Sequence, residues 1–157
     1  MAVEVSLSVE RAVAMRLAPD AAFALLSDVP AWGAFFPHAE RVEAFPPAGP
    51  HAYRWEMAPL GPPGGAVRVV YACRYAADVA ARTVVWTPVA GVGNGVFSGA
   101  IALGPAPGGG TAGAFRLDAR LTIPAPQFVR GLVVAAVTFE FGRMVDTFTG
   151  RLAALEP

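Results

Sequence analysis

The feature that most restricts the fold is a long helix-like segment that follows a series of short alternating strands. The strands end near Leu121, and residues 126–155 then have the pattern of one long helix with almost no charge in its first half. A single long helix after a curved antiparallel sheet can bury its apolar side across the concave face of that sheet. The space between them becomes a packed core or a pocket, so a small-molecule carrier is one hypothesis.

The composition is that of a single domain, residues 1–157, and it argues against several classes of protein. A chain of 157 residues has the usual size of one domain. Twelve basic and twelve acidic residues balance, which gives no electrostatic sign of a nucleic-acid partner. The longest strongly apolar run, 132–137, is far shorter than the ~20 residues of a membrane span. The N-terminal residues alternate like a strand rather than a secretory signal, so we expect a cytoplasmic protein without an integral membrane segment.

Metal and thiol chemistry find little support in the sequence. The chain contains one cysteine, Cys73, and two histidines, His38 and His51, on different segments. A lone cysteine cannot form an internal disulfide, and no three-ligand set for a metal is evident. We therefore expect no metal and no cofactor. Cys73 lies on the apolar parity of its strand, where a buried and inert thiol is expected.

Period-two alternation predicts the strands. Residues 3–9 alternate apolar and polar side chains, and the pattern extends towards Met15. Glycine and proline clusters at 46–50, 61–65, 91–95 and 104–110 separate the later strands. These later strands are predicted at 42–45, 53–57, 67–75, 83–87, 97–103 and 115–121. The cluster at 91–95 is glycine-rich, but a strand follows it rather than the helix that a phosphate-binding loop requires, which indicates a hairpin turn.

Two short helices are predicted between the first and second strands. The first opens at 18–20, because proline suits the first helical position and Asp20 lies where the helix dipole favours an anion. Residues 27–30 end it. A second short helix then carries Trp32, Phe35 and Phe36 and ends at a proline.

The alternation also sorts the side chains of the strands between two faces. One face is apolar and rich in aromatic residues, and we expect it to face the long helix; the other carries the charges and should face water. The first set is Tyr53, Trp55, Met57, Tyr71, Tyr75, Phe115 and Leu117, and the second includes Arg54, Arg68, Arg74, Arg116 and Arg120.

The order of elements and three local sequences resemble the helix-grip fold of the START and Bet v 1-like superfamily (SRPBCC, polyketide cyclase-like). Residues 18–28, APDAAFALLSD, are similar to the first helix of bacterial members. Trp32 followed by residues 36–43, FPHAERVE, is similar to their second helix and second strand, and residues 122–124, TIP, resemble the closing element before the long helix.

The resemblance implies an α+β fold, with a curved antiparallel sheet of six or seven strands wrapped around a long C-terminal helix. It also implies a hydrophobic cavity between sheet and helix. Members of the superfamily bind lipids, sterols, quinones, polyketides or plant hormones there, and some are polyketide cyclases or accessory proteins of larger enzymes.

The candidate binding residues are those expected to face the space between sheet and helix. They are Trp32, Phe36, Tyr53, Trp55, Met57, Tyr71, Cys73, Trp86, Phe97, Phe115, Leu117, Phe128, Leu132, Ala136, Phe139, Glu140 and Arg143. The same aromatic residues would equally fill a core, and the lack of convergent polar groups adds weight to a core, so the sequence supports a pocket and a filled core about equally. Glu140 and Arg143 lie three residues apart, so they can pair on the helix surface or orient a polar head group.

The sequence favours binding of a hydrophobic small molecule or lipid, without chemistry and with micromolar affinity. Two other functions stay open. A polyketide cyclase-like or hydrolase-like enzyme would need a polar pair in the cavity, such as Tyr53 or Tyr71 near Arg143. An accessory protein with a filled core would use the apolar helix to dock onto a protein partner. No catalytic residue is assigned.

Overall fold

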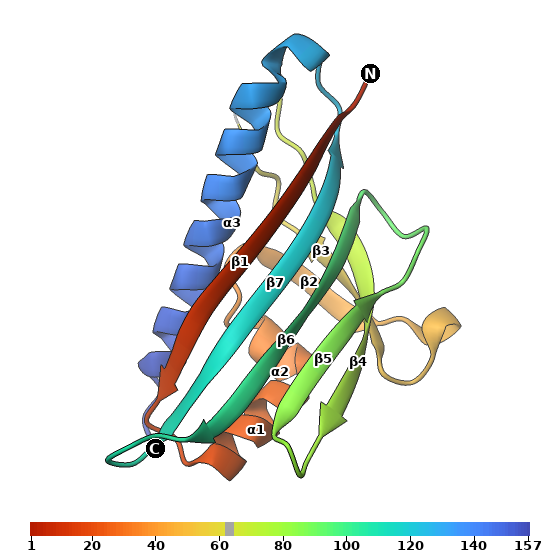
Figure 1. Cartoon of the computed structure of the whole chain (residues 1–157). Helices are drawn as coiled ribbons and strands as arrows, with labels where there is room; N and C mark the ends of the chain where they lie inside the picture. Colours follow the sequence, from red (N-terminus) through yellow and green to blue (C-terminus); the bar gives the residue numbers. More distant parts are fainter. Residues whose placement is uncertain (62–64) are drawn as a thin grey trace.

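A curved antiparallel sheet of seven strands wraps around a long C-terminal helix (Figure 1). The computed structural model describes residues 1–61 and 65–157, so part of the predicted turn at 61–65 lies outside the described residues. The strands are β1 (Val3–Met15), β2 (Ala39–Ala44), β3 (Ala52–Met57), β4 (Val70–Asp78), β5 (Thr83–Pro88), β6 (Gly95–Pro105) and β7 (Thr111–Ile123). Their order in the sheet is β1-β7-β6-β5-β4-β3-β2, which makes β1 and β2 the edges. The predicted α+β helix-grip architecture is confirmed.

Two short helices follow β1, as predicted, and one long helix follows β7. The helices are α1 (Pro19–Ser27), α2 (Val29–Gly33) and α3 (Arg130–Ala153), with 3-10 turns η1 (Pro46–Ala48) and η2 (Gln127–Val129). Asp28 separates the first two, because its side chain accepts a hydrogen bond from the backbone N–H of Ala31 at the start of α2. α2 is shorter than predicted and ends at Gly33, so Phe35 and Phe36 lie in the turn after it.

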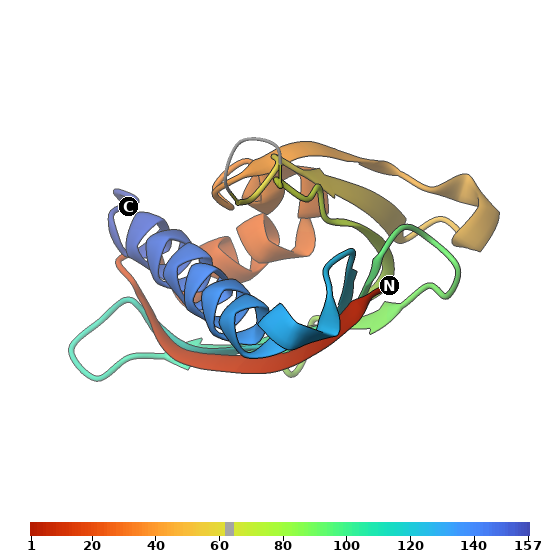
Figure 2. The same cartoon turned by 90° about the horizontal axis from the view of Figure 1, so that it is seen from above.

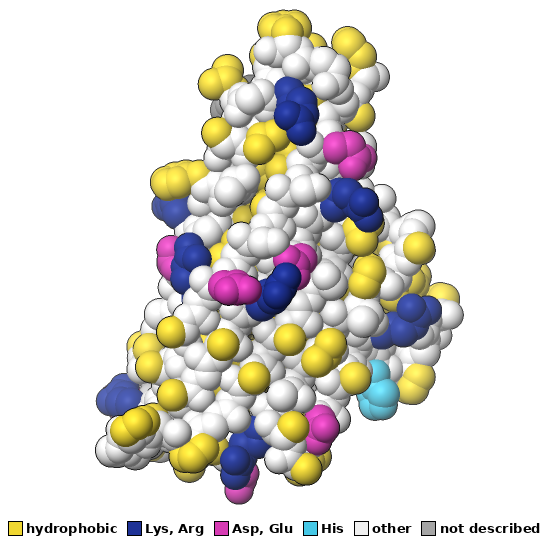
Figure 3. Space-filling model, viewed as in Figure 1, with side chains coloured by type: hydrophobic (Ala, Val, Ile, Leu, Met, Phe, Trp, Pro, Cys, Tyr) yellow, Lys and Arg dark blue, Asp and Glu magenta, His cyan; other side chains and the backbone are white. Residues whose placement is uncertain are grey.

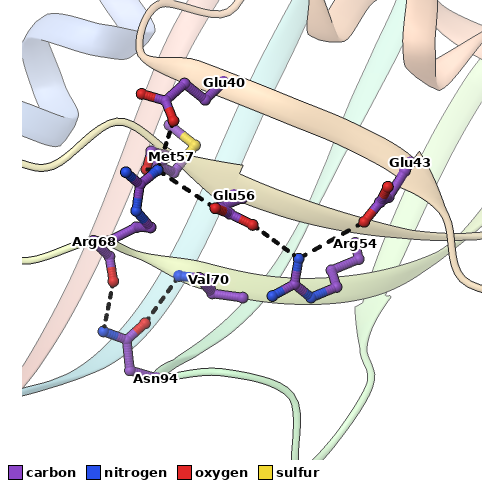
Figure 4. Close-up of polar contacts among 8 residues, drawn as sticks. All are labelled: Glu40, Glu43, Arg54, Glu56, Met57, Arg68, Val70 and Asn94. Carbon is purple, nitrogen blue, oxygen red and sulfur yellow. Dashed lines mark hydrogen bonds and ion pairs between the residues drawn. The ribbon is translucent and has the colours of Figure 1, made fainter.

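The strand predicted over 67–75 begins at Val70, three residues later than expected, because the side chain of Asn94 forms hydrogen bonds with the backbone at the start of this segment. Asn94, in the turn between β5 and β6, accepts a hydrogen bond from Val70 N at 2.9 Å and donates one to Arg68 O at 3.0 Å (Figure 4). In the same turn Gly93 has a φ of +65°, and a Cβ there would lie 2.1 Å from Val70 O. The glycine-rich cluster is therefore a turn that packs on β4, and the predicted hairpin is confirmed.

The predicted sorting of strand side chains between two faces holds. Trp55, Met57 and Phe115 are buried, and Tyr53 is half-buried. The arginines lie on the outer face, where Arg54, Arg68 and Arg116 form ion pairs. Arg54 pairs with Glu56 at 3.1 Å, and Arg68 pairs with Glu40 at 2.6 Å (Figure 4). Figure 3 shows charged side chains of both signs across the outward face of the sheet, and hydrophobic side chains are scattered between them.

The two halves of α3 are buried to very different extents. α3 lies on the concave side of the sheet (Figure 2). All of its fully buried residues lie from the middle of the helix onward: Phe141, Met144, Val145, Phe148 and Leu152. Every residue from Arg130 to Glu140 is exposed or half-buried. The helix is therefore anchored at its C-terminal half and stands partly away from the sheet at its N-terminal half.

Candidate functional site

The aromatic residues between α2, the second half of α3 and the centre of the sheet form a filled core. Trp32 lies 5.2 Å from Trp55 and 5.5 Å from Phe148 between ring centroids, and Tyr71 stacks on Phe97 at 3.8 Å. The free space among these rings is about 10 Å³, room for one water molecule at most. The predicted site residues in this core are Trp32, Phe36, Trp55, Tyr71, Trp86, Phe97, Phe115 and Leu117, and Met57 and Cys73 are buried in the same hydrophobic core.

The polar groups of this core are held neutral. Trp55 Nε1 donates a hydrogen bond to the Tyr75 hydroxyl at 2.7 Å. Burial raises the pKa of Tyr71 and of Tyr75 well above the usual range of a phenol. Burial also raises the pKa of Cys73 to about 12, and its Sγ donates to Phe97 O at 3.3 Å. A neutral, enclosed thiol is a poor nucleophile.

A half-open pocket of about 170 Å³ lies at the other end of the helix. One wall comes from the first half of α3, and the opposite wall comes from the end of β7 and from the segment between β3 and β4. The lining residues are Val133, Ala136, Val137, Glu140 and Phe141 on α3, Leu121 and Ile123 on β7, and Leu60, Gly61, Gly65, Val67 and Val69. Among these described residues, all are apolar or glycine except Glu140.

The pocket follows from the spacing of residues on α3 and from the way the helix leans. Val133, Ala136, Val137 and Glu140 are spaced by three and four residues, so they share one side of the helix. On the other side α3 packs chiefly against β1, where Arg11 Nε lies 2.6 Å from an oxygen of Asp146. The opposite wall is shaped by a single bridge between Leu60 and Val67, whose backbone groups exchange two hydrogen bonds of 2.9 and 2.8 Å. The helix leans towards β1 and leaves a gap beside this wall.

The structure corrects the expected positions of three candidate residues. Phe128, Leu132 and Phe139 are 88%, 75% and 64% exposed instead of facing the space between helix and sheet. The first half of α3 is apolar on nearly every side, so its sequence does not indicate which side turns inward. Phe139 lies beneath Arg143, whose guanidinium carbon is 5.8 Å from the ring centroid.

The remaining candidates divide between the pocket and the surface. Ala136 and Glu140 line the pocket, as expected, whereas Arg143 is exposed and donates a hydrogen bond to Glu140 at 3.3 Å. The pairing of Glu140 and Arg143 on the helix surface is confirmed. Sequence reasoning missed Val133 and Val137, although their spacing from Ala136 and Glu140 indicates the same helix side. It also missed Leu60, Val67, Val69, Leu121 and Ile123, because strand alternation does not reveal which end of a face stays uncovered.

The polar pair suggested for an enzyme, Tyr53 or Tyr71 near Arg143, is not formed. Tyr71 is enclosed by the aromatic core, while Arg143 points to solvent beside Glu140. Tyr53 is half-buried, with its ring edge against Tyr75 at 6.0 Å. Within residues 1–61 and 65–157, no three His, Cys, Asp or Glu side chains are grouped so that they could hold a metal ion. No helix in the described part of the chain is both long enough and apolar enough to cross a membrane.

Comparison with known structures identifies the fold. A protein of Thermus thermophilus has a TM-score of 0.65 and 18% identity, over 94% of this chain and 96% of that one. The Zhui aromatase/cyclase from Streptomyces sp. R1128 has a TM-score of 0.62 and 18% identity, over 94% and 93%. A START superfamily protein from Mycobacterium smegmatis has a TM-score of 0.56 and 15% identity, over 96% and 97%.

These likenesses concern the fold. No known protein family matches the sequence, and no curated protein matches it either. The structural neighbours cover nearly the whole chain at identities below 25%, and they show that the chain has the START/Bet v 1-like helix-grip fold.

Proposed function

We propose that this protein, which has the START/Bet v 1-like fold, binds a small hydrophobic molecule in the half-open pocket under the first half of α3, without chemistry. The observation that carries the proposal is the pocket itself, a concave and almost wholly apolar surface beside a filled core. Apolar walls with few polar groups are typical of small-molecule sites. The named neighbours include an aromatase/cyclase, but the residue pair that would support an enzyme is not assembled here.

The volume of the pocket limits the size of the ligand. A cavity of about 150 Å³ lined by aliphatic and aromatic side chains is known to hold benzene. The pocket of about 170 Å³ therefore suits one aromatic ring or a chain of about six carbons. A ligand of several rings, or a whole lipid, requires the first half of α3 to move outward.

The size of the pocket also limits the expected affinity. A six-carbon ligand buries about 200 Å² of apolar surface, which contributes about 5 kcal/mol before the cost of immobilisation. That free energy corresponds to a dissociation constant on the order of 0.1 mM or weaker. This is weaker than the micromolar value expected from the sequence, because the aromatic core leaves no room for the larger ligand then envisaged.

Titration with 1-hexanol tests the proposal. We expect saturable amide shifts in the NMR spectrum at Val133, Val137, Leu121 and Val67, around the pocket. Ala136→Trp should fill the pocket and weaken binding by at least about tenfold. Ala135→Trp is the matched control, because Ala135 is an equally exposed alanine on the same turn but does not line the pocket.

Circular dichroism should show that both tryptophan variants remain folded. Binding unchanged by Ala136→Trp would contradict the assignment of the pocket. A wild-type protein without saturable shifts would contradict the carrier function and favour the accessory-protein hypothesis.

A further inference from the structure

We infer that the pocket selects its ligands by charge, and that it prefers an apolar molecule with a positively charged amine head over neutral or anionic ones. The inference rests on the proposed function, since it concerns the same pocket. Its basis is the position of Glu140, the one charged side chain among the described residues that line the pocket. An otherwise apolar cavity with one carboxylate at its wall favours an apolar body joined to a hydrogen-bond donor.

Glu140 lines the pocket, whereas its ion-pair partner Arg143 faces the solvent. The Glu140 side chain is 35% exposed and lines the cavity beside Ala136 and Val137. The Arg143 side chain is 66% exposed and lies over Phe139, a residue that is not part of the pocket. Arg143 bonds to Oε1 of the carboxylate, and an ionised carboxylate can accept from several donors at once. An ammonium group can therefore join the pair or replace Arg143.

The opposite wall offers no cation to an anionic ligand among the residues that the structure describes there. Arg68 lies between the lining residues Val67 and Val69, but its guanidinium is on the outer face of the sheet. There it pairs with Glu40 at 2.6 Å and with Glu56 at 3.5 Å (Figure 4). A carboxylate head in the pocket would face Glu140, and the two like charges would repel each other.

The expected preference is modest, because Glu140 is partly hydrated. Ion pairs between partly exposed groups contribute about a two- to fivefold change in affinity. We expect the amine to bind two- to fivefold more tightly than the neutral analogue, and the carboxylate to bind more weakly by about the same factor.

Three probes with the same six-carbon chain test this inference: n-hexylamine, 1-hexanol and hexanoate at pH 7. We expect the dissociation constants to rise in that order. Glu140→Gln keeps the shape of the side chain and removes its charge, so it should bring all three constants close to that of 1-hexanol. Arg143→Gln is the matched control, because it removes the competing cation and should preserve or widen the preference for the amine.

A salt series in the wild-type protein provides a readout that needs no variant. Raising the ionic strength from 0.1 M to 1 M shortens the screening length from about 10 Å to about 3 Å. The difference between hexylamine and hexanoate should shrink, while 1-hexanol should bind no more weakly. A merely structural role for Glu140 would not produce this change.

Each outcome separates the inference from the proposed function. Saturable binding of all three probes with equal constants overturns the charge preference and leaves the hydrophobic pocket intact. Tightest binding of hexanoate overturns it as well and assigns the head group to Arg143. No saturable binding of any probe overturns the proposed function itself.

Discussion

Two phenylalanines on α3 show that the position of a residue determines its contribution to stability more than its type does. Phe148 is fully buried and contacts Trp32, Phe36 and Phe115, whereas Phe139 is 64% exposed. Phe148→Ala should lower the free energy of unfolding by about 3–5 kcal/mol, the usual cost of emptying an aromatic core site. Phe139→Ala should cost less than about 1 kcal/mol, as for most surface substitutions. Urea denaturation of both variants measures the two values, and similar losses would contradict the assignment of Phe139 to the surface.

The same pair marks the limit of what the sequence could predict at single residues. In the strands, Arg54 and Trp55 alternate with their neighbours, so their opposite faces could be assigned from period two alone. In α3 Val133, Val134 and Phe139 are all apolar although they lie on different sides of the helix. An apolar pattern without a polar side does not fix the rotation of a helix, so the inward residues depend on how α3 leans against β1.

The unequal anchoring of the two halves of α3 predicts unequal local stability. Residues 141–152 carry all of the fully buried side chains of the helix, while residues 134–139 border the pocket or the solvent. Opening the first half exposes little apolar surface, so its amides should exchange with solvent at least about tenfold faster than those of the second half. Hydrogen exchange followed by NMR measures this. Saturation with 1-hexanol should slow exchange in the first half only, and uniform protection along α3 would contradict the unequal anchoring.

At the level of elements, the sequence predicted the order and type of the helices and strands better than the residues at which they begin and end. Alternation placed all seven strands, and the proline and aspartate at 19–20 placed α1. The start of β4 was wrong because Asn94, twenty-four residues away from Val70, supplies the hydrogen bonds there. A pocket between helix and sheet was expected, with Ala136 and Glu140 in it, but its second wall was missed, since that wall depends on the bridge between Leu60 and Val67. Neither the Asn94 contact nor this bridge leaves a periodic signal in the segments that form it.

Cys73 offers a measure of the stability of the whole molecule. It lies on β4 near the middle of the sheet with no exposed surface, and burial raises its pKa to about 12. Opening the first half of α3 leaves it covered, so a thiol reagent should label it only after global unfolding. Labelling of the wild type in native buffer should be slow, and Phe148→Ala should accelerate it by the factor of its lost stability, at least about a hundredfold for 3 kcal/mol or more. Rapid labelling of the native wild type would contradict this.

The titration of the same thiol has a defined sign. The folded state holds Cys73 neutral up to about pH 12, whereas an unfolded cysteine ionises near pH 8.5. The unfolded chain therefore releases a proton first as the pH rises. Stability conferred by the neutral thiol is complete below about pH 8.5 and declines above it, so global labelling should accelerate at alkaline pH beyond the effect of thiolate reactivity alone.

The position of β2 at the edge of the sheet affects the tendency of the protein to aggregate in concentrated solution. An edge strand presents unpaired backbone groups that can recruit a strand from another molecule and so begin aggregation. Three of the six residues of β2 are charged, Glu40, Arg41 and Glu43, and α3 runs along β1 at the other edge. A strand of another molecule that paired with β2 would have to remove water from these charges or place its own side chains opposite them. Both edges of the sheet thus discourage growth into fibres, although 55% of the residues are hydrophobic and one pocket is apolar.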